Sequence, residues 1–223
     1  MAVPAQVTYS RSEEYLAFKD QMLTEALNVF SDATWTVKKQ KKGFTSRKRD
    51  TEILGHRLRG CVGDLDIHID TLMKMLTDPK VMEIGYNIDR EMITETKILE
   101  HVDEFSVIVY QVYKMPFPMK NRYLTTMVAW KRVDDGQIVV NSKSLKHKDT
   151  PVVEKLIEME MPVDAFLLKP QDGKVYTQYA GHYDPCGSVP EFVKEMIGSE
   201  QYGRLALTAD GYRKMVKKGI AIQ

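Results

Sequence analysis

The 223-residue sequence is short of cysteine and of net charge, and each shortage excludes a class of protein. Its two cysteines, Cys61 and Cys186, lie far apart and outside any CxxC or Cys/His cluster, which favours free thiols in a reducing compartment and no metal site. Lys and Arg number 32, against 31 Asp and Glu. A nucleic-acid-binding protein needs a larger excess of positive charge to displace counterions, so we expect no nucleic-acid partner.

Long apolar runs are missing as well. No run approaches the ~18–20 residues that a helix needs to cross a bilayer. The first residues, Met-Ala-Val-Pro, contain no apolar signal core, and Ala2 occupies the position where N-myristoylation requires glycine. We therefore expect a cytoplasmic protein whose association with membranes is transient and confined to their surface.

Motifs of the common enzyme classes are also absent. The chain has no GxSxG, HExxH, P-loop or GxGxxG motif, and its five histidines are scattered. His182 lies near Asp184 and could take part in acid–base chemistry, although a loop histidine beside an acid is more often a surface pair. We expect neither catalytic activity nor a cofactor, and an enzyme of the cyclase or hydrolase type is the alternative from another class.

The apolar residues that are present change their spacing along the chain, which predicts helices and strands in turn. A helical stripe over residues 11–31 precedes the strands. Two short helices separate the third strand from the fourth, one capped by Asp64 and one starting at Pro79. The expected strands cover residues 34–43, 44–50, 54–62, 92–101, 106–113, 124–132, 137–145, 165–169 and 174–183.

The C-terminal segment returns to a helical pattern. It starts at Pro190, and its glycines predict a kink or break near 198–204 and an end at Gly219. Runs of strands followed by a helix favour an α+β fold with one antiparallel sheet. A sheet this long tends to curl, and the last helix can cover its concave face. We expect one domain over residues 1–223, with its core at about 11–218.

Three stretches of the chain resemble the StAR-related lipid-transfer (START) domain family. Met115–Arg122 (MPFPMKNR) resembles the turn between the family's fifth and sixth strands, most closely in the phosphatidylcholine-transfer type. Residues 97–104 and 107–110 resemble its fourth and fifth strands, and Tyr183–Pro190 resembles the entry into its last helix. The resemblance implies a helix-grip fold, in which a curved antiparallel sheet of about nine strands wraps around a long C-terminal helix and encloses a lipid cavity.

The same resemblance implies a function, which is the binding and non-vesicular transfer of a single lipid in a cavity gated by the C-terminal helix. Because the sequence departs from the family pattern at several positions, the resemblance does not identify the lipid. Tyr123 stands where the family usually has Asp, and Val128 stands where sterol-binding members have Arg. Phospholipid, sterol, sphingolipid and fatty acid all remain open. A lipid sensor that holds its ligand is an alternative to a carrier, and we expect a monomer.

Strand alternation predicts which side chains line the cavity. Most are apolar, and Gln111, Asn141 and Lys143 are the polar anchors. A buried ammonium needs an anionic partner, so Lys143 favours a lipid phosphate or carboxylate, whereas a register shifted by one residue would turn it to solvent. The predicted lipid-binding residues are Val109, Gln111, Tyr113, Leu124, Thr126, Val128, Trp130, Asn141, Lys143, Phe192 and Met196.

A basic cluster in the first hairpin is the strongest local charge feature of the sequence. Near an anionic membrane each cation contributes about 1 kcal/mol, so the cluster is a candidate membrane-docking surface. The alternative is an ordinary solvated face of the hairpin. The cluster consists of Lys38, Lys39, Lys41, Lys42, Arg47, Lys48 and Arg49.

Overall fold

The computed structural model describes residues 7–31, 34–49, 52, 55–88 and 91–222. These residues contain one ten-stranded sheet, whose order is β1-β2-β3-β10-β9-β7-β6-β5-β4 with β8 beside β6. Neighbouring strands pair antiparallel, apart from the parallel pairing of β6 with β8. The strands are β1 (Trp35–Lys41), β2 (Phe44–Arg49), β3 (Arg59–Leu65), β4 (Ile93–Asp103), β5 (Ser106–Tyr113), β6 (Arg122–Arg132), β7 (Ile138–Ser144), β8 (Ile157–Glu158), β9 (Glu160–Gln171) and β10 (Lys174–Asp184).

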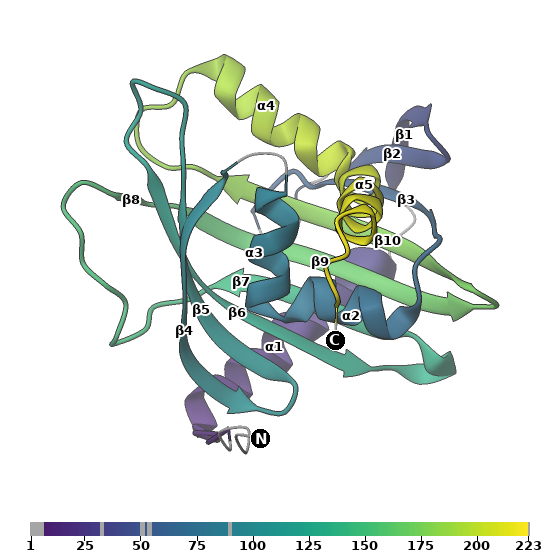
Figure 1. The fold of residues 1–223 in the computed structure, drawn as a ribbon, viewed down its shortest axis with the longest axis horizontal. Helices are drawn as coiled ribbons and strands as arrows, with labels where there is room; N and C mark the ends of the chain where they lie inside the picture. The colour runs from purple at the N-terminus through teal and green to yellow at the C-terminus, as the bar shows by residue number, and fades with distance from the viewer. Residues whose placement is uncertain (1–6, 32–33, 50–51, 53–54, 89–90, 223) are drawn as a thin grey trace.

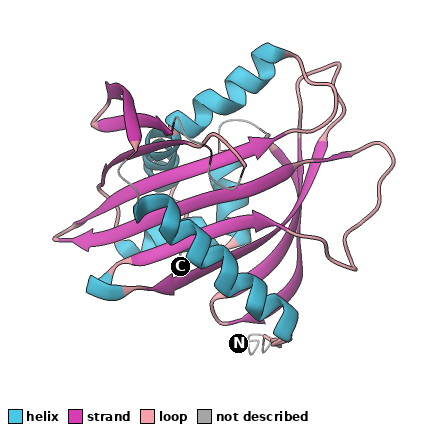
Figure 2. Ribbon diagram, turned by 180° about the vertical axis from the view of Figure 1, so that it is seen from behind, coloured by secondary structure: helices cyan, strands magenta, loops and turns pink. Residues whose placement is uncertain are grey.

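Helices cover both faces of this sheet. Figure 2 shows α1 crossing one face, and Figure 1 shows the other helices on the opposite side, where α4 and α5 contact β3 and β10. None of the helices in the described ranges is long and apolar enough to cross a membrane. The helices are α1 (Glu13–Ser31), α2 (Ile69–Thr77), α3 (Pro79–Asn87), α4 (Glu191–Tyr202) and α5 (Arg204–Lys217).

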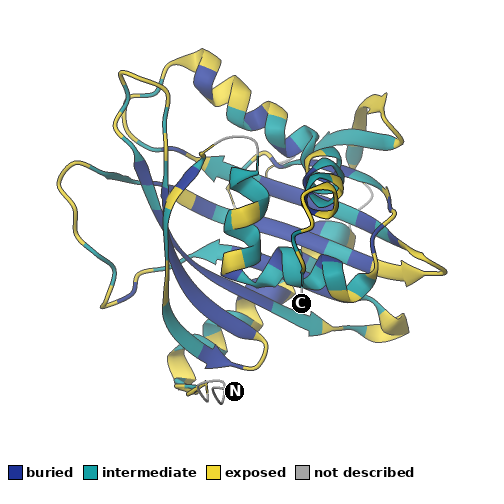
Figure 3. Ribbon diagram, in the orientation of Figure 1, coloured by how far each residue is buried: buried dark blue, intermediate teal, exposed yellow. Residues whose placement is uncertain are grey.

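Each face of the sheet carries its own hydrophobic layer. Met22 and Ala26 of α1 pack on one face against Met127 of β6. On the other face, Leu72 of α2 and Leu205 of α5 belong to one cluster with Phe166 of β9. Figure 3 shows the buried residues concentrated along the central strands. This arrangement confirms the helix-grip fold and the antiparallel sheet of about nine strands that the sequence predicts.

The starts of the two short helices differ from the prediction in one case. Asp64 was expected to cap the first of them, but it belongs to β3, and α2 starts at Ile69. The cap is His68, whose Nδ1 accepts a hydrogen bond from the backbone N–H of Asp70 at 3.3 Å. The strand therefore continues past the expected turn, because residues 63–65 complete its pairing with β10.

Residues 50 and 54, which end the expected second strand and open the third, lie outside the described residues.

The predicted break in the C-terminal helix is confirmed. Gly203 separates α4 from α5, and its backbone N–H contacts the carbonyl groups of Ser199 and Glu200, each at 3.1 Å. Gly219 follows the end of α5 with a φ of +66°, a conformation that favours glycine. The C-terminal segment is thus two helices joined at a glycine rather than one rigid rod.

Candidate functional site

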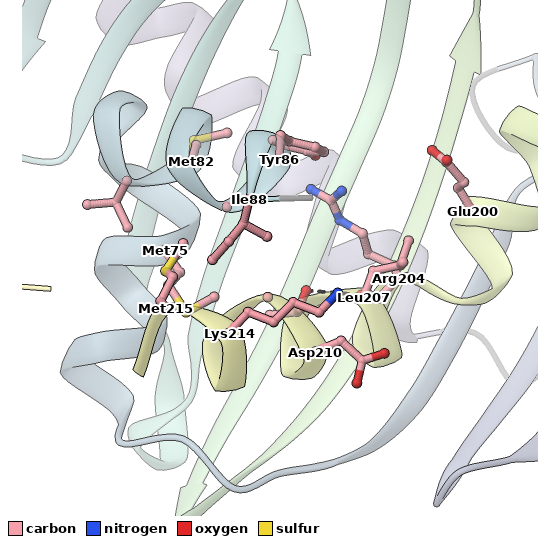
Figure 4. A pocket seen from close by; sticks show the side chains of 14 residues that line it. Met75, Met82, Tyr86, Ile88, Glu200, Arg204, Leu207, Asp210, Lys214 and Met215 are labelled. Carbon is pink, nitrogen blue, oxygen red and sulfur yellow. Dashed lines mark hydrogen bonds between the residues drawn. The ribbon is translucent and has the colours of Figure 1, made fainter. Parts of the chain in front are cut away.

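A cleft of about 260 Å³ lies between α5 and the pair of helices α2 and α3 (Figure 4). Its walls are mainly apolar, and methionines come from all three helices. Because methionine is flexible and polarisable, such walls adapt to ligands of different shapes. The apolar wall residues are Met75, Val81, Met82, Ile88, Leu207 and Met215.

Arg204 brings a positive charge to this cleft. It is the first residue of α5, and Figure 4 shows its guanidinium pointing toward Tyr86 of α3. Its Cζ lies 4.9 Å from the centre of the Tyr86 ring. Arg204 Nη2 also lies 3.8 Å from Asp164 Oδ2 on β9, and both side chains are largely buried. A weakly hydrated, planar guanidinium suits such a partly dry site better than an ammonium would.

Tyrosines surround the Arg204–Asp164 pair. Tyr183 donates its hydroxyl to Asp164 Oδ1 at 2.7 Å, and the ring of Tyr179 lies 6.0 Å from Arg204 Cζ. Burial raises the pKa of Tyr86 and Tyr183 above the usual value for a phenol. These hydroxyls therefore remain neutral hydrogen-bond donors at physiological pH.

The residues predicted to line the cavity from β5 and β6 do share one face. Val109 pairs with Thr126, and Gln111 pairs with Leu124, which places all four side chains on the same side. That face carries Trp130, which packs with the cluster around Leu72, so it is the face under α2 and α5. All the predicted residues from the two strands are buried or half-buried; they are Val109, Gln111, Tyr113, Leu124, Thr126, Val128 and Trp130.

Polar groups on this face bond to one another. Tyr113 donates its hydroxyl to Gln111 Oε1 at 2.9 Å, and Gln111 Nε2 lies 3.5 Å from Thr96 Oγ1. Burial raises the pKa of Tyr113, and Tyr86 is the next largest cause. Tyr113 of β5 is therefore close enough to Tyr86 for that side chain to affect its pKa. Contact of these residues with a lipid stays a prediction.

The predicted positions of Asn141 and Lys143 are wrong. In β7, Val140 pairs with Trp130 and Ser142 with Val128, so the odd-numbered residues face α1 on the opposite side of the sheet. The connection of five residues between Arg132 and Ile138 fixes this register, and a shift by one residue moves every side chain to the other face.

On the α1 face, both polar side chains have protein partners. Asn141 Nδ2 donates to the carbonyl group of Met22 at 2.8 Å, and Asn141 Oδ1 accepts from the backbone N–H of Asp164 at 3.2 Å. Lys143 Nζ bonds to Glu25 Oε2 at 2.5 Å. The anionic partner expected for Lys143 is thus a side chain of α1 and not a lipid.

The two residues predicted from the last helix are also misplaced. Phe192 is 66% exposed and Met196 is 42% exposed, so neither is buried against the sheet. The buried face of α4 carries Val193, Gly198 and Gln201 instead. The helix is rotated so that Gly198 meets β3, where a Cβ atom would lie only 1.8 Å from Arg59 Nη1.

The basic cluster of the first hairpin divides into two groups. Lys38, Lys39, Lys41 and Lys42 are exposed, as a docking surface requires. Arg47 lies over the Trp35 ring at 4.4 Å and donates to Gln178 Oε1 at 2.9 Å, and Lys48 is half-buried. Arg49 is only 3% exposed, with its Nη1 donating to the carbonyl group of Val29 at 3.2 Å. The prediction of a docking role for Arg47 and Arg49 is therefore wrong, because both arginines serve to pack the hairpin.

A second cavity, of about 440 Å³, lies at the far end of the same sheet. Val128 and Trp130 contribute to its wall, together with Pro79 at the start of α3 and the hairpin between β4 and β5. The edge of the Phe105 ring packs on Trp130, with the ring centres 5.0 Å apart. Two of the predicted lining residues therefore border this cavity rather than the cleft at α5.

Sequence reasoning missed Asp164, Tyr86, Tyr179 and Arg204. No local pattern identifies them, because packing brings Tyr86 of α3 together with residues of β9, β10 and α5 that follow it by more than 70 positions. The sequence does contain a signal for a nearby residue, Gln201. An apolar residue recurs every four positions at Val193, Ile197 and Leu205, and Gln201 interrupts this stripe.

A curved sheet that holds a broken C-terminal helix above a largely apolar cleft defines the helix-grip class of protein. The sequence model of the START domain family matches residues 72–206, more than half of the chain. The chain therefore belongs to the START domain family. A search of curated protein sequences gives no match.

Solved structures share this fold at low sequence identity. Human StAR-related lipid transfer protein 5 superposes with a TM-score of 0.76 at 14% identity, covering 91% of this chain and 98% of that one. Human STARD10 gives 0.69 at 17% identity, covering 96% of this chain and 83% of that one. A fragment of the StAR-related lipid transfer protein from Xanthomonas axonopodis gives 0.66 at 19% identity, covering 81% of this chain and 99% of the fragment.

Proposed function

We propose that this protein binds one lipid molecule, of the phospholipid, sterol or fatty-acid class, beneath its C-terminal helices and transfers it between membranes without vesicles. The observation that carries the proposal is the cleft of about 260 Å³, whose walls are mainly apolar and which contains the largely buried Arg204. Ligand sites commonly combine such walls with a few placed polar groups. Membership of the START family and the similarity to two solved lipid transfer proteins, human StAR-related lipid transfer protein 5 and the Xanthomonas axonopodis protein, support it.

Lipid entry requires an opening, and the C-terminal helices are the elements that we propose move. Gly203 provides a hinge between α4 and α5. Arg59 of β3 contacts α4 next to Gly198, and its Cζ lies 5.8 Å from the centre of the Tyr202 ring. Outward movement of α4 would break these contacts while α5 kept its packing through Leu205, so the gate would be α4 together with the hinge.

Filling the cleft should block transfer. Leu207 lines the cleft and is 42% exposed, so Leu207→Trp can narrow the cleft without overpacking a closed core. We expect the rate of lipid transfer between donor and acceptor vesicles to fall at least about tenfold, with little change in melting temperature. Val216→Trp is the matched control, because Val216 lies on the same helix, is 58% exposed and is not part of the cleft. Equal transfer by wild type and Leu207→Trp would contradict the proposal.

We also propose that the exposed lysines of the first hairpin attract the protein to anionic membranes. Replacing Lys38, Lys39 and Lys41 with alanine should remove about 1 kcal/mol of membrane attraction per charge, which lowers binding to phosphatidylserine vesicles by at least tenfold. Binding to phosphatidylcholine vesicles should stay unchanged. The control changes Lys169 and Lys174, exposed residues near the tip of the β9–β10 hairpin, to alanine. A similar loss from the control variant would show that only net charge matters and would remove the hairpin's special role.

We propose that the protein acts by binding rather than by catalysis. His182, the residue considered for acid–base chemistry, stacks on His56 with ring centres 4.5 Å apart. Burial, followed by the neighbouring His56, lowers the pKa of His182, which favours its neutral form. Release of a chemically altered lipid after incubation with the protein would contradict this proposal.

A further inference from the structure

Gln201 is the most unusual buried residue of the C-terminal helices. It is 1% exposed, and neither Oε1 nor Nε2 of its side chain has a hydrogen-bond partner among the described residues. Leaving a buried polar group unpaired is costly, and native proteins rarely accept it without a reason. Val193 and Leu205, two turns before and one turn after Gln201, are both fully buried and apolar. The stripe would be continuous if an apolar residue replaced the glutamine.

Other unpaired donors lie around Gln201. The backbone carbonyl group of Gln201 lies 3.8 Å from Cys61 Sγ, and Cys61 pairs with Tyr179 across the sheet. Arg204 Nε is buried without a hydrogen-bond partner in the described part of the chain, and the buried Tyr179 hydroxyl lies beside Asp164 without a hydrogen bond of good geometry. The side chains of Gln201, Tyr179 and Arg204 together offer more N–H and O–H donors than acceptors. A ligand that fits them must be rich in acceptor oxygen atoms.

The charges at the α4–α5 junction also favour a ligand that is rich in acceptor oxygen atoms. Arg204 and Arg59 bring two cations, and Asp164 is the carboxylate that lies beside Arg204. Among the acids that line the cleft, Asp210 pairs with Arg213 at 3.2 Å and with Lys42 at 3.6 Å. Figure 4 shows the carboxylate of Asp210 pointing away from the guanidinium of Arg204. A ligand in the cleft would meet the guanidinium of Arg204, which favours an anion.

The size of the cleft limits the rest of the ligand. Its volume of about 260 Å³ is slightly below the ~300–1,000 Å³ that is common for sites holding drug-sized ligands. It suits one alkyl chain better than two. The Met-rich wall between α2, α3 and α5 can pack along such a chain, while its charged end reaches Arg204.

We propose that Gln201, Arg204 and Tyr179 form a binding site for the anionic headgroup of a single-chain lipid, either a carboxylate or a phosphate monoester. This inference rests on the proposed function, because it assumes that the cleft holds a lipid. It specifies the chemical class of the lipid and the residues that recognise it. It also explains why a buried glutamine has no protein partner, since the headgroup would be that partner.

Gln201→Met tests the site because methionine has a similar shape and no amide. Binding to purified protein is measured for three probes of equal chain length, below their aggregation concentrations: dodecanoate, dodecyl phosphate and dodecanol. Wild type should bind one of the two anions at least about tenfold more tightly than dodecanol, and the tighter anion identifies the headgroup. In Gln201→Met, binding of that anion should weaken by about tenfold, whereas dodecanol binding should change less than about twofold.

The same variant gives an independent readout without any ligand. Because the amide is unpaired, Gln201→Met should raise the melting temperature by a few degrees, whereas Gln40→Met on the exposed face of β1 should leave it unchanged. A lower melting temperature in Gln201→Met would overturn the inference. Equal binding of dodecanol and the anions would overturn it too, and would leave the proposed lipid cleft standing. Failure of all three probes to bind would also overturn the inference, but not the proposed function, which includes phospholipids and sterols.

Discussion

Replacing Arg122 with methionine should lower the free energy of unfolding by about 3–4 kcal/mol, which corresponds to a fall in melting temperature of about 10 °C for a chain of this size. Arg122 is 1% exposed and is the largest of the fully buried side chains. Its partners are backbone carbonyl groups: Nε donates to Pro185 at 2.6 Å, Nη1 to Lys120 at 2.5 Å and Nη2 to Cys186 at 3.1 Å.

These three bonds join the turn before β6 to the loop that leads into α4. Methionine would fill part of the space but would leave the carbonyl groups unpaired, including that of the buried Pro185, which costs more than the loss of the bonds alone. Burial lowers the pKa of Arg122, because removal from water disfavours the charged form of the guanidinium. Thermal unfolding of Arg122→Met and of Arg132→Met, an exposed arginine at the far end of the same strand, is the measurement. A loss below 1 kcal/mol in Arg122→Met would contradict this role.

Asp164→Asn should destabilise the protein by about 3 kcal/mol, the second largest effect that we expect. The change keeps an oxygen atom that can accept from the Tyr183 hydroxyl, but it leaves the largely buried Arg204 without its acidic partner. Removing one member of a buried ion pair is costly because the remaining charge is uncompensated, whereas removing both can be almost neutral.

A double-mutant cycle separates this effect from loss of packing. We expect the double variant Asp164→Asn/Arg204→Met to lie within about 1 kcal/mol of wild type in unfolding experiments, well above the Asp164→Asn single variant. If the double variant lost the sum of the two single effects, Asp164 and Arg204 would not act as a pair. The distance of 3.8 Å between their charged atoms would then reflect proximity without coupling.

Much of the fold could be predicted from the sequence because local signals and long-range packing agree. The break near Gly203, the helix start at Pro79 and the strand over 106–113 follow from residue types with strong local preferences. The error at Asp64 has a physical cause. A good capping residue can also end a strand, and pairing of residues 63–65 with β10 outweighs the local preference.

The site was harder to predict than the fold, since it depends on register and on helix rotation. Strand alternation correctly grouped the β5 and β6 residues, but the face of β7 depends on the length of the connection before it, and this placed Asn141 and Lys143 on the α1 side. The ion pair between Asp164 and Arg204 joins residues of β9 and α5 that no sequence spacing relates. Gln201 was not predicted either, although its position in an apolar stripe can be seen in the sequence.

The most direct test of lipid binding is native mass spectrometry of the protein after incubation with mixed vesicles and repurification. The vesicles contain phosphatidylcholine, phosphatidylserine, lysophosphatidate, ceramide, cholesterol and oleic acid, so that one experiment compares all the lipid classes. We expect wild type to carry a single adduct with the mass of one lipid, and Leu207→Trp to lack that adduct while Val216→Trp keeps it. A folded wild-type protein that returns from the vesicles with no adduct would contradict lipid binding in the cleft.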